Sequence, residues 1–259
     1  MSDEARLEEG PSGLAPATRG WFVVNVADAA WRTHPRFGAS CGFESRDVAP
    51  FAELGINIRV LDPGQPSGLY HSESHQEGFL VLTGEALLVV GDDQRPLRAW
   101  DFLHCPPGTD HLLVGAGDGP CVLLDVGARA TDWSQQGLHY PVSEVAAGFD
   151  ASVATETSNP REACAEVEWP EPGRPQAPGL PWHEHPAVPR AEIGSSGRLI
   201  DRRGRDVRSH YEGRCCAARH SAPACRRSAA RPHPPSALIA SLGALECDRL
   251  NFNYAAGQR

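Results

Sequence analysis

The chain has 259 residues, enough to bury a substantial core in one large domain or two small ones. Its 26 Gly and 23 Pro, set against 7% aromatic residues, favour many short elements joined by turns and argue against a long helical bundle. All 24 basic residues are arginine and the formal charge is -9, but residues 1–189 carry 11 Arg and 27 acids, whereas residues 190–259 carry 13 Arg and 6 acids.

The N-terminal segment and the cysteines indicate a cytoplasmic protein. MSDEARLEEG is acidic and polar, whereas a secretory signal is basic and then apolar, and the chain contains no run of about 18 apolar residues. The eight cysteines form no CxxC pair, and Cys41, Cys105, Cys121 and Cys164 are widely scattered, so free thiols are expected. We therefore expect a cytoplasmic location and no membrane partner.

The first part of the chain predicts β-structure. Residues 1–20 are polar and aperiodic, which predicts a disordered leader, and WFVVNV at 21–26 suits the first strand. From there to residue 130, short apolar runs alternate with turn signals, as in antiparallel sandwiches and barrels. The clearest runs are INIRVL (56–61), FLVLTG (79–84), EALLVVGDDQ (85–94), LLVGAG (112–117) and CVLLDV (121–126).

Turn residues divide this region further. Thr83-Gly84 and Gly91-Asp92-Asp93 are predicted to close two successive hairpins. PVSEVAAGF, residues 141–149, predicts a brief helix because a Ser and a Glu precede a short apolar run. The ordered domain is expected to span residues 21–165.

The chain changes in character after residue 165. Residues 166–198 are so rich in proline that neither helix nor sheet is expected to continue, although Trp169 and Trp182 could attach the segment to the core. Residues 199–259 are rich in Arg, Ala and Pro and lack a hydrophobic period. Three interpretations of this tail stay open: a disordered extension, which we favour, a basic arm for nucleic acid, or the product of a shifted reading frame.

Four potential metal ligands stand at predicted strand ends. Residues two apart in a strand share a face, so His71 and Glu73 project together. Glu77 follows a turn as the first inward residue of the next strand, and His111 heads the strand after PPGTD. Two imidazoles and two carboxylates could therefore surround one ion.

The spacing of these ligands resembles that of the cupins. The first cupin motif, G-x5-H-x-H-x3,4-E-x6-G, is matched at His71, Glu77 and Gly84. Glu73 stands in the place of the second histidine, and Gly64 lies one residue further upstream than the motif requires. The resemblance therefore carries over His71 and Glu77 as metal ligands, and Glu73 by position alone.

A second cupin motif, G-x5-P-x-G-x2-H-x3-N, is matched at Pro106, Gly108 and His111. Trp100 replaces its leading glycine, and Gly115 replaces its final asparagine. The motifs cover roughly residues 50–130 and are similar to those of small single-domain bacterial cupins. The resemblance implies an all-β fold, a single cupin double-stranded β-helix or jelly-roll barrel with irregular N- and C-terminal extensions, and adds His111 as a metal ligand.

The resemblance implies one divalent metal ion, Fe, Mn or Zn, bound by His71, Glu73, Glu77 and His111. A metal-dependent dioxygenase or isomerase acting on a small organic molecule is the enzymatic hypothesis, with Glu73 as general base when it is not coordinated. The alternative is a non-catalytic ligand-binding or structural cupin in which Glu73 pairs with an arginine such as Arg59 or Arg98.

The nature of the pocket lining separates possible ligands. Inward polar side chains favour an anionic or sugar-like molecule, and an apolar lining favours an apolar ligand or none. The expected partners are this small molecule and a second copy of the chain, joined through barrel edges. Nucleic acid is not expected as a partner, because no helix-turn-helix precedes the barrel.

Three other candidates have simpler interpretations. Tyr70 could supply a phenol at the pocket rim or pack as an aromatic side chain. Cys105 either lines the pocket or packs in the core, with His104 facing the opposite way. HEH at 183–185 lies between prolines and is interpreted as a solvated loop.

Overall fold

The computed structural model describes residues 3–45, 48–130, 136–183, 192–193 and 199–200. The chain divides into two units, Met1–His185 with Leu242–Arg259 and Pro186–Ser241. In the second unit, β13 (Glu192–Ile193) pairs antiparallel with β14 (Leu199–Ile200). The interpretations of the arginine-rich tail otherwise concern residues 201–259, which lie outside the described part of the chain.

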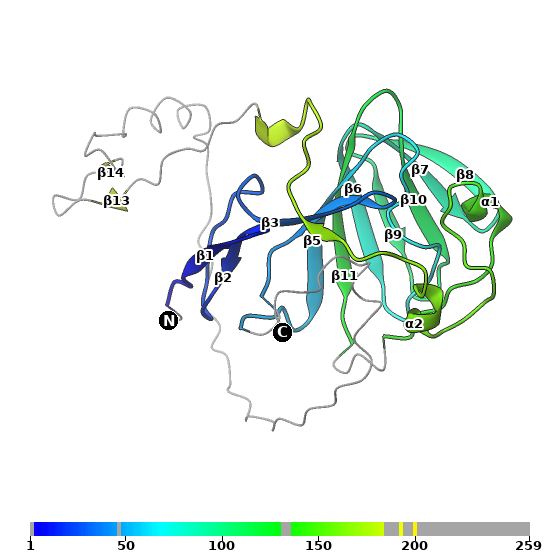
Figure 1. The fold of residues 1–259 in the computed structure, drawn as a ribbon, viewed down its shortest axis with the longest axis horizontal. Coiled ribbons are helices and arrows are strands. Elements are labelled where there is room, and N and C mark those ends of the chain that lie inside the picture. Colours follow the sequence, from blue (N-terminus) through cyan, green and yellow to red (C-terminus); the bar gives the residue numbers. More distant parts are fainter. Residues whose placement is uncertain (1–2, 46–47, 131–135, 184–191, 194–198, 201–259) are drawn as a thin grey trace, which may run out of the picture. The chain divides into compact units, whose positions relative to one another are not determined.

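Two antiparallel sheets form the body of the first unit (Figure 1). The larger sheet has the strand order β12-β3-β4-β5-β11-β6-β9, and the smaller has the order β10-β7-β8. The strands are β3 (Ala30–His34), β4 (Gly38–Gly42), β5 (Leu54–Leu61), β6 (Glu77–Thr83), β7 (Glu85–Val90), β8 (Asp93–Arg98), β9 (Phe102–Cys105), β10 (His111–Ala116), β11 (Cys121–Ala128) and β12 (Glu171–Pro172). The predicted all-β fold is confirmed.

The core lies between the two sheets. Alternate residues of each strand face inward, and Val81, Leu113 and Leu123 are buried there with residues from both sheets. Towards one end of the large sheet the same alternation turns polar, because Asn57 and Asp125, directly opposite each other on β5 and β11, are also buried. A polar site is thus built into one end of an apolar barrel.

Part of the predicted disordered leader is ordered, so that prediction is wrong. β1 (Leu7–Gly10) pairs antiparallel with β2 (Gly13–Pro16), and the backbone N–H of Trp31 donates to the Ser12 carbonyl at 2.7 Å. Backbone pairing, which composition does not reveal, orders this polar segment.

The strand predicted at residues 21–26 is also wrong, because these described residues form no strand. Trp21 makes only an isolated bridge to Glu4, and Val23 is 71% exposed. Val24 and Val26 instead pack against the outer face of the large sheet, where the Val26 carbonyl accepts a hydrogen bond from the Trp31 indole. The apolar side chains therefore serve loop packing rather than a sheet.

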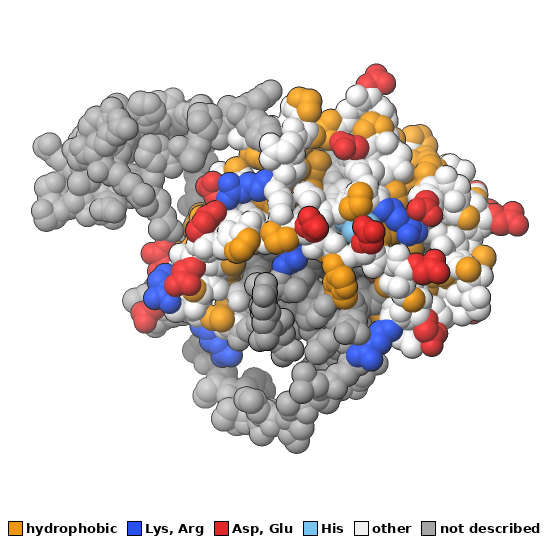
Figure 2. Space-filling view, in the orientation of Figure 1, with side chains coloured by type: hydrophobic (Ala, Val, Ile, Leu, Met, Phe, Trp, Pro, Cys, Tyr) orange, Lys and Arg blue, Asp and Glu red, His pale blue; other side chains and the backbone are white. Residues whose placement is uncertain are grey.

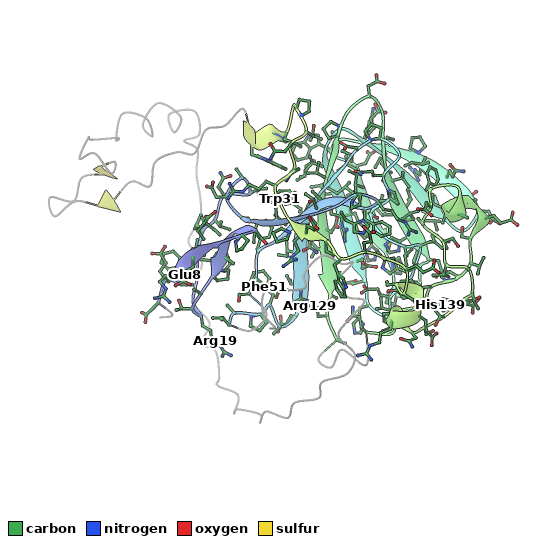
Figure 3. The ribbon with its side chains drawn as sticks, viewed as in Figure 1. Glu8, Arg19, Trp31, Phe51, Arg129 and His139 are labelled. Atoms are coloured by element: carbon green, nitrogen blue, oxygen red, sulfur yellow. The ribbon has the colours of Figure 1, made fainter. Side chains whose placement is uncertain are left out.

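The proline-rich segment also packs on this outer face as far as residue 183. Leu180 is fully buried in a cluster with Trp31, which Figure 3 labels, and the centroid of the Trp182 ring lies 5.4 Å from that of Trp31. A 3-10 turn, η2, covers Pro181–His183. Trp169, by contrast, is 52% exposed. The ordered domain thus extends beyond residue 165, and the expectation that no sheet continues there is wrong, because β12 pairs with β3 and large side chains anchor the residues that follow.

One of the two predicted hairpins is correct. β7 and β8 pair antiparallel around Gly91, but β6 and β7 belong to different sheets, so the predicted Thr83-Gly84 hairpin is wrong. Gly84 has a φ of 76°, and a Cβ there would lie 2.5 Å from the Pro120 carbonyl oxygen. This glycine lets the chain pass from one sheet to the other in a space too small for a side chain.

Two short helices follow the barrel. In the region 141–149, the chain forms α1 (Glu144–Ala147), and Ser143 caps it by accepting from the Ala146 N–H. α2 (Pro160–Ala163) begins with proline after the Asn159 cap. No helix in the described ranges is long and apolar enough to cross a membrane.

Four cysteines lie in the described part of this unit. Cys41, Cys105 and Cys121 are free and buried, but Cys164 is disulfide-bonded, so the expectation of free thiols is wrong at that position. On the face shown in Figure 2, hydrophobic side chains lie singly or in small groups between charged ones.

Candidate metal centre

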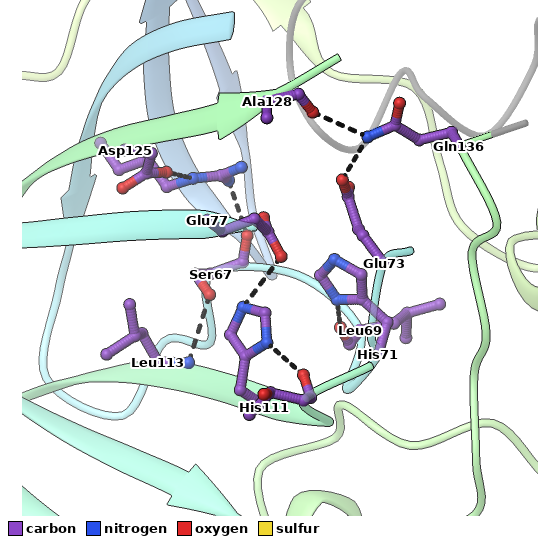
Figure 4. A network of polar contacts seen from close by, with 12 residues as sticks. Ser67, Leu69, His71, Glu73, Glu77, His111, Leu113, Asp125, Ala128 and Gln136 are labelled. Carbon is purple, nitrogen blue, oxygen red and sulfur yellow. Dashed lines mark hydrogen bonds and ion pairs between the residues drawn. The ribbon is translucent and has the colours of Figure 1, made fainter. Parts of the chain in front are cut away.

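The four predicted ligands meet at the polar end of the core. Glu77 is the first residue of β6 and His111 the first residue of β10. His71 lies beside His111, since the two backbones exchange hydrogen bonds of 2.9 and 3.3 Å. Glu73 follows two residues later on the same side of the chain. All four line one pocket with Gln136 (Figure 4).

The side chains of these residues converge within coordinating range of one another. Donor atoms of His71, Glu73 and Glu77 all lie within 4.8 Å of one another. The Nε2 atom of His111 is 3.6 Å from a carboxylate oxygen of Glu77, and its ring centroid is 5.3 Å from that of His71. The structure thus brings together all four residues that the motifs predicted.

Backbone carbonyls orient both imidazoles. The Nδ1 atom of His71 lies 2.8 Å from the Leu69 carbonyl, and that of His111 lies 2.9 Å from the Thr109 carbonyl. A carbonyl only accepts, so each Nδ1 carries the proton and each Nε2 presents a lone pair to the pocket. The Nε2 atom of His71 is buried and has no hydrogen-bond partner among the described residues. Such an unpartnered acceptor fits a cation.

The electrostatics of the site also favour a cation. Burial, with a smaller effect of neighbouring His111, lowers the pKa of His71 to about 3, and burial lowers the pKa of His111. Burial and the charge of Asp125 raise the pKa of Glu77. Both imidazoles are therefore neutral at pH 7, and a cation would stabilise the ionised form of Glu77.

Gln136 holds Glu73 in the pocket, and sequence analysis missed it. Its Nε2 donates to Oε2 of Glu73 and, at 3.1 Å, to the Ala128 carbonyl, while its Oε1 accepts from the Ala130 N–H at 2.9 Å. With both ends of its amide engaged, Gln136 fixes one carboxylate oxygen of Glu73 in position. Gln136 lies in a polar run without periodicity, which carries no signal of burial.

A buried ion pair lies beside the predicted ligands. Arg59 donates through Nε to Asp125 and through Nη1, at 2.6 Å, to the Ser67 carbonyl. Arg59, which was considered as a partner of Glu73, is thus engaged with Asp125, and Arg98 lies on the exposed strand β8. Asn57 and Arg59 stand two residues apart in INIRVL, so both point to the inward face of the strand. This alternation is the sequence signal that could have found them.

A second arginine is paired near the pocket. Arg129 donates to both carboxylate oxygens of Glu44 and to the Phe51 carbonyl. The Glu44 side chain is only 3% exposed. The lining therefore combines imidazoles, carboxylates, two side-chain amides and two paired guanidinium groups, which is the polar alternative that sequence analysis left open.

The remaining candidates lie outside the site. Tyr70 packs with Val89 and Leu112, and its hydroxyl accepts from the Gly91 N–H at 2.9 Å, so the packing interpretation is correct. Cys105 is buried in the core between the sheets, whereas His104 is exposed. Of HEH at 183–185, His183 ends η2, and residues 184–185 lie outside the described part of the chain.

The sheets, the site and a family match define the class of the domain at residues 57–127. Residues 57–127 match the family model described as a cupin domain. The antiparallel barrel has the cupin double-stranded β-helix fold, with the predicted ligands at the starts of β6 and β10 and in the segment before β6. Residues 57–127 are thus a cupin domain, and the predicted resemblance is confirmed.

Several solved structures are similar to part of the chain. A sugar phosphate isomerase of the cupin superfamily from Silicibacter pomeroyi is 23% identical, covers 42% of this chain and 76% of its own, and has a TM-score of 0.37. A Cupin 2 conserved barrel domain protein from Salinispora arenicola is 25% identical, covers 37% of this chain and 78% of its own, and has a TM-score of 0.32. An RmlC-like cupin from Shewanella frigidimarina is 20% identical, covers 42% of this chain and 91% of its own, and has a TM-score of 0.36. No curated protein matches the chain.

Proposed function

We propose that this cupin binds one divalent metal ion through His71, Glu77 and His111, with Glu73 as the fourth ligand. The observation that carries the proposal is the buried Nε2 atom of His71, which has a lone pair and no partner among the described residues. The convergence of the other three side chains on the same pocket supports it. Two imidazoles and two carboxylates suit Fe, Mn or Zn.

The pocket beside the proposed metal would bind a small polar molecule. When bound, the metal would supply Lewis-acid polarisation of a substrate oxygen or activation of dioxygen. Glu73 would accept or return a proton if it is not coordinated, held at its place by Gln136. An isomerase uses such a base directly and is the enzymatic function that we favour.

Two other functions remain as hypotheses. A dioxygenase is supported by the two histidines and Glu77, which form a two-histidine, one-carboxylate set without Glu73. A ligand-binding cupin without turnover would use the same metal and pocket. We also propose a cytoplasmic location and a homodimer. Light scattering of the purified chain would test the homodimer.

Elemental analysis of protein purified without nickel affinity tests the metal site. About one equivalent of Fe, Mn or Zn per chain is expected in the wild type, and loss of that metal in His111→Ala and Glu77→Gln. His104→Ala is the matched control, because His104 is exposed on β9. A folded wild-type protein that stays metal-free when supplied with these ions would refute the proposal.

Glu73→Gln separates the two roles of Glu73. Gln can keep a hydrogen bond with Gln136, but it cannot carry the negative charge of a ligand or of a base. Weaker metal binding would place Glu73 among the ligands. Full metal content with lost turnover would make Glu73 the base instead.

A further inference from the structure

Two buried oxygen atoms in the pocket lack hydrogen-bond donors. The Oδ1 atoms of Asn57 and Asp125 have no partner among the described residues, although both side chains are more than nine-tenths buried. An unpaired buried acceptor destabilises the fold, because folding removes its hydration and supplies no hydrogen bond in return. The fold therefore retains two unfavourable groups at one place, both lining the pocket that holds the candidate ligands.

These two acceptors are neighbours. Asn57 on β5 and Asp125 on β11 are directly paired in the antiparallel register, so their side chains stand on the same face of the sheet. The other carboxylate oxygen of Asp125 is engaged by Arg59, which fixes the orientation of that side chain. The pair forms an acceptor shelf, a name used below for Asn57 Oδ1 and Asp125 Oδ1.

The charges around the shelf disfavour an anion. Both arginines of the described lining are already paired with carboxylates, Arg59 with Asp125 and Arg129 with Glu44. A divalent ion would be balanced by the two carboxylates of Glu73 and Glu77. A phosphate group entering the pocket would then meet two acceptors and guanidinium groups whose charge is already balanced, so beyond the metal and the Asn57 amide N–H it would find little to replace its hydration.

The geometry points to a neutral polyhydroxylated molecule as the ligand of this pocket, with neighbouring hydroxyl groups that donate to the acceptor shelf. Each hydroxyl would supply the donor that one of these oxygens lacks. This inference rests on the proposed function, because the same molecule would lie beside the metal. It adds the substrate class: a polyol or unphosphorylated sugar rather than a sugar phosphate.

Calorimetric titration of the full chain, with and without added Mn(II), tests the shelf. The neutral probes are D-ribose, D-xylose and myo-inositol, and the anionic probes are D-ribose 5-phosphate and inorganic phosphate. We expect at least one neutral probe to bind and the anionic probes to bind at least tenfold more weakly. Tighter binding of the phosphorylated probe, or no binding of neutral probes to protein that holds its metal, would overturn the inference.

Asn57→Leu is the informative variant because leucine keeps the shape and removes the unpaired acceptor. Its affinity for the neutral probe should fall about tenfold, whereas its melting temperature should stay level or rise. Ser40→Ala is the matched control: Ser40 Oγ is also buried and unpartnered among the described residues, but Ser40 lies outside the pocket lining. That variant should bind the probe like the wild type.

The two proposals fail separately. Metal content, measured on the same samples, judges the proposed metal site alone. If Asn57→Leu binds the sugar more weakly than the wild type, the shelf is supported, even when the chain holds no metal. Wild-type affinity in folded Asn57→Leu would refute the shelf while leaving the metal site standing.

Discussion

The buried carboxyl of Glu77 predicts an unusual pH dependence for the metal-free protein. Burial, with a further effect of Asp125, raises the pKa of Glu77 from 4.5 to about 8 in the folded state. Between these values the folded chain keeps a proton that the unfolded chain has lost, so the free energy of unfolding falls as pH rises. Burial lowers the pKa of His71 to about 3 and also lowers the pKa of His111, so both have the opposite effect, which fades as the histidines of the unfolded chain deprotonate above pH 6.5.

Above pH 6.5 the Glu77 effect is therefore expected to dominate. One pH unit is worth about 1.4 kcal/mol for a fully exchanged proton; because Glu77 is half ionised at pH 8 and the histidines offset part of its effect, stability should fall by about 1 kcal/mol between pH 6.5 and 8. Urea unfolding of chelator-treated protein at the two pH values measures this difference directly.

Two further measurements identify Glu77 as the cause. The chelated Glu77→Gln variant has no such proton to lose, so its stability should be level or rise slightly over the same range, as the histidines alone predict. Added metal should reverse the wild-type trend, because the ion displaces the proton from Glu77. A wild-type stability that stays level or rises without metal, or an equal fall in Glu77→Gln, would refute this reasoning.

Four other substitutions test separate parts of the structure. Gln136→Leu should weaken metal binding about tenfold, measured by competition with a chelator, because it releases Glu73. Trp100→Gly should stabilise the chain to urea by about 1 kcal/mol, since Trp100 has a φ of 74° and is 75% exposed. Gly84→Ala should cost about 3 kcal/mol because a Cβ there meets a backbone carbonyl. Leu180→Ala should cost about 3 kcal/mol if the proline-rich segment packs on the sheet as described.

The barrel strands could be predicted because each depends on a local pattern. A strand such as β11 appears as an apolar run, and a turn such as that at Gly91 is marked by glycine and aspartate. The candidate ligands His71, Glu73 and Glu77 could be predicted because their spacing is set by one turn between consecutive segments, whereas His111 depended on the second cupin motif. Such features need no knowledge of what lies across the sheet.

The acceptor shelf could not be predicted in the same way. Asn57 and Asp125 are far apart in the chain and meet only because β5 pairs with β11 in one register. Both lie in runs that are mostly apolar. Only their place in the alternation of inward and outward residues indicates that their side chains face the core. The Thr83-Gly84 prediction failed for a related reason: a turn signal fixes the bend but not which strand becomes the neighbour.

Two departures from the cupin motifs have physical explanations. Trp100 replaces a motif glycine yet keeps a positive φ, so the turn has kept the glycine conformation with a residue that is strained there. Gly115 replaces a motif asparagine, and a Cβ at this position would lie 2.3 Å from the Asp62 carbonyl oxygen. The backbone around Gly115 has therefore closed on space that a side chain would need.

The third departure, Glu73 in place of histidine, is matched by the surroundings of that residue. A histidine that offered one nitrogen to a metal would have to donate its other N–H to an acceptor. At this position Gln136 presents an amide N–H, and its oxygen is already engaged by the Ala130 N–H. This donor therefore suits a carboxylate at position 73, whereas it would leave the N–H of a histidine there without an acceptor. Glu73 and Gln136 thus form one unit, and a charged oxygen ligand at this place is consistent with the buried contacts around it.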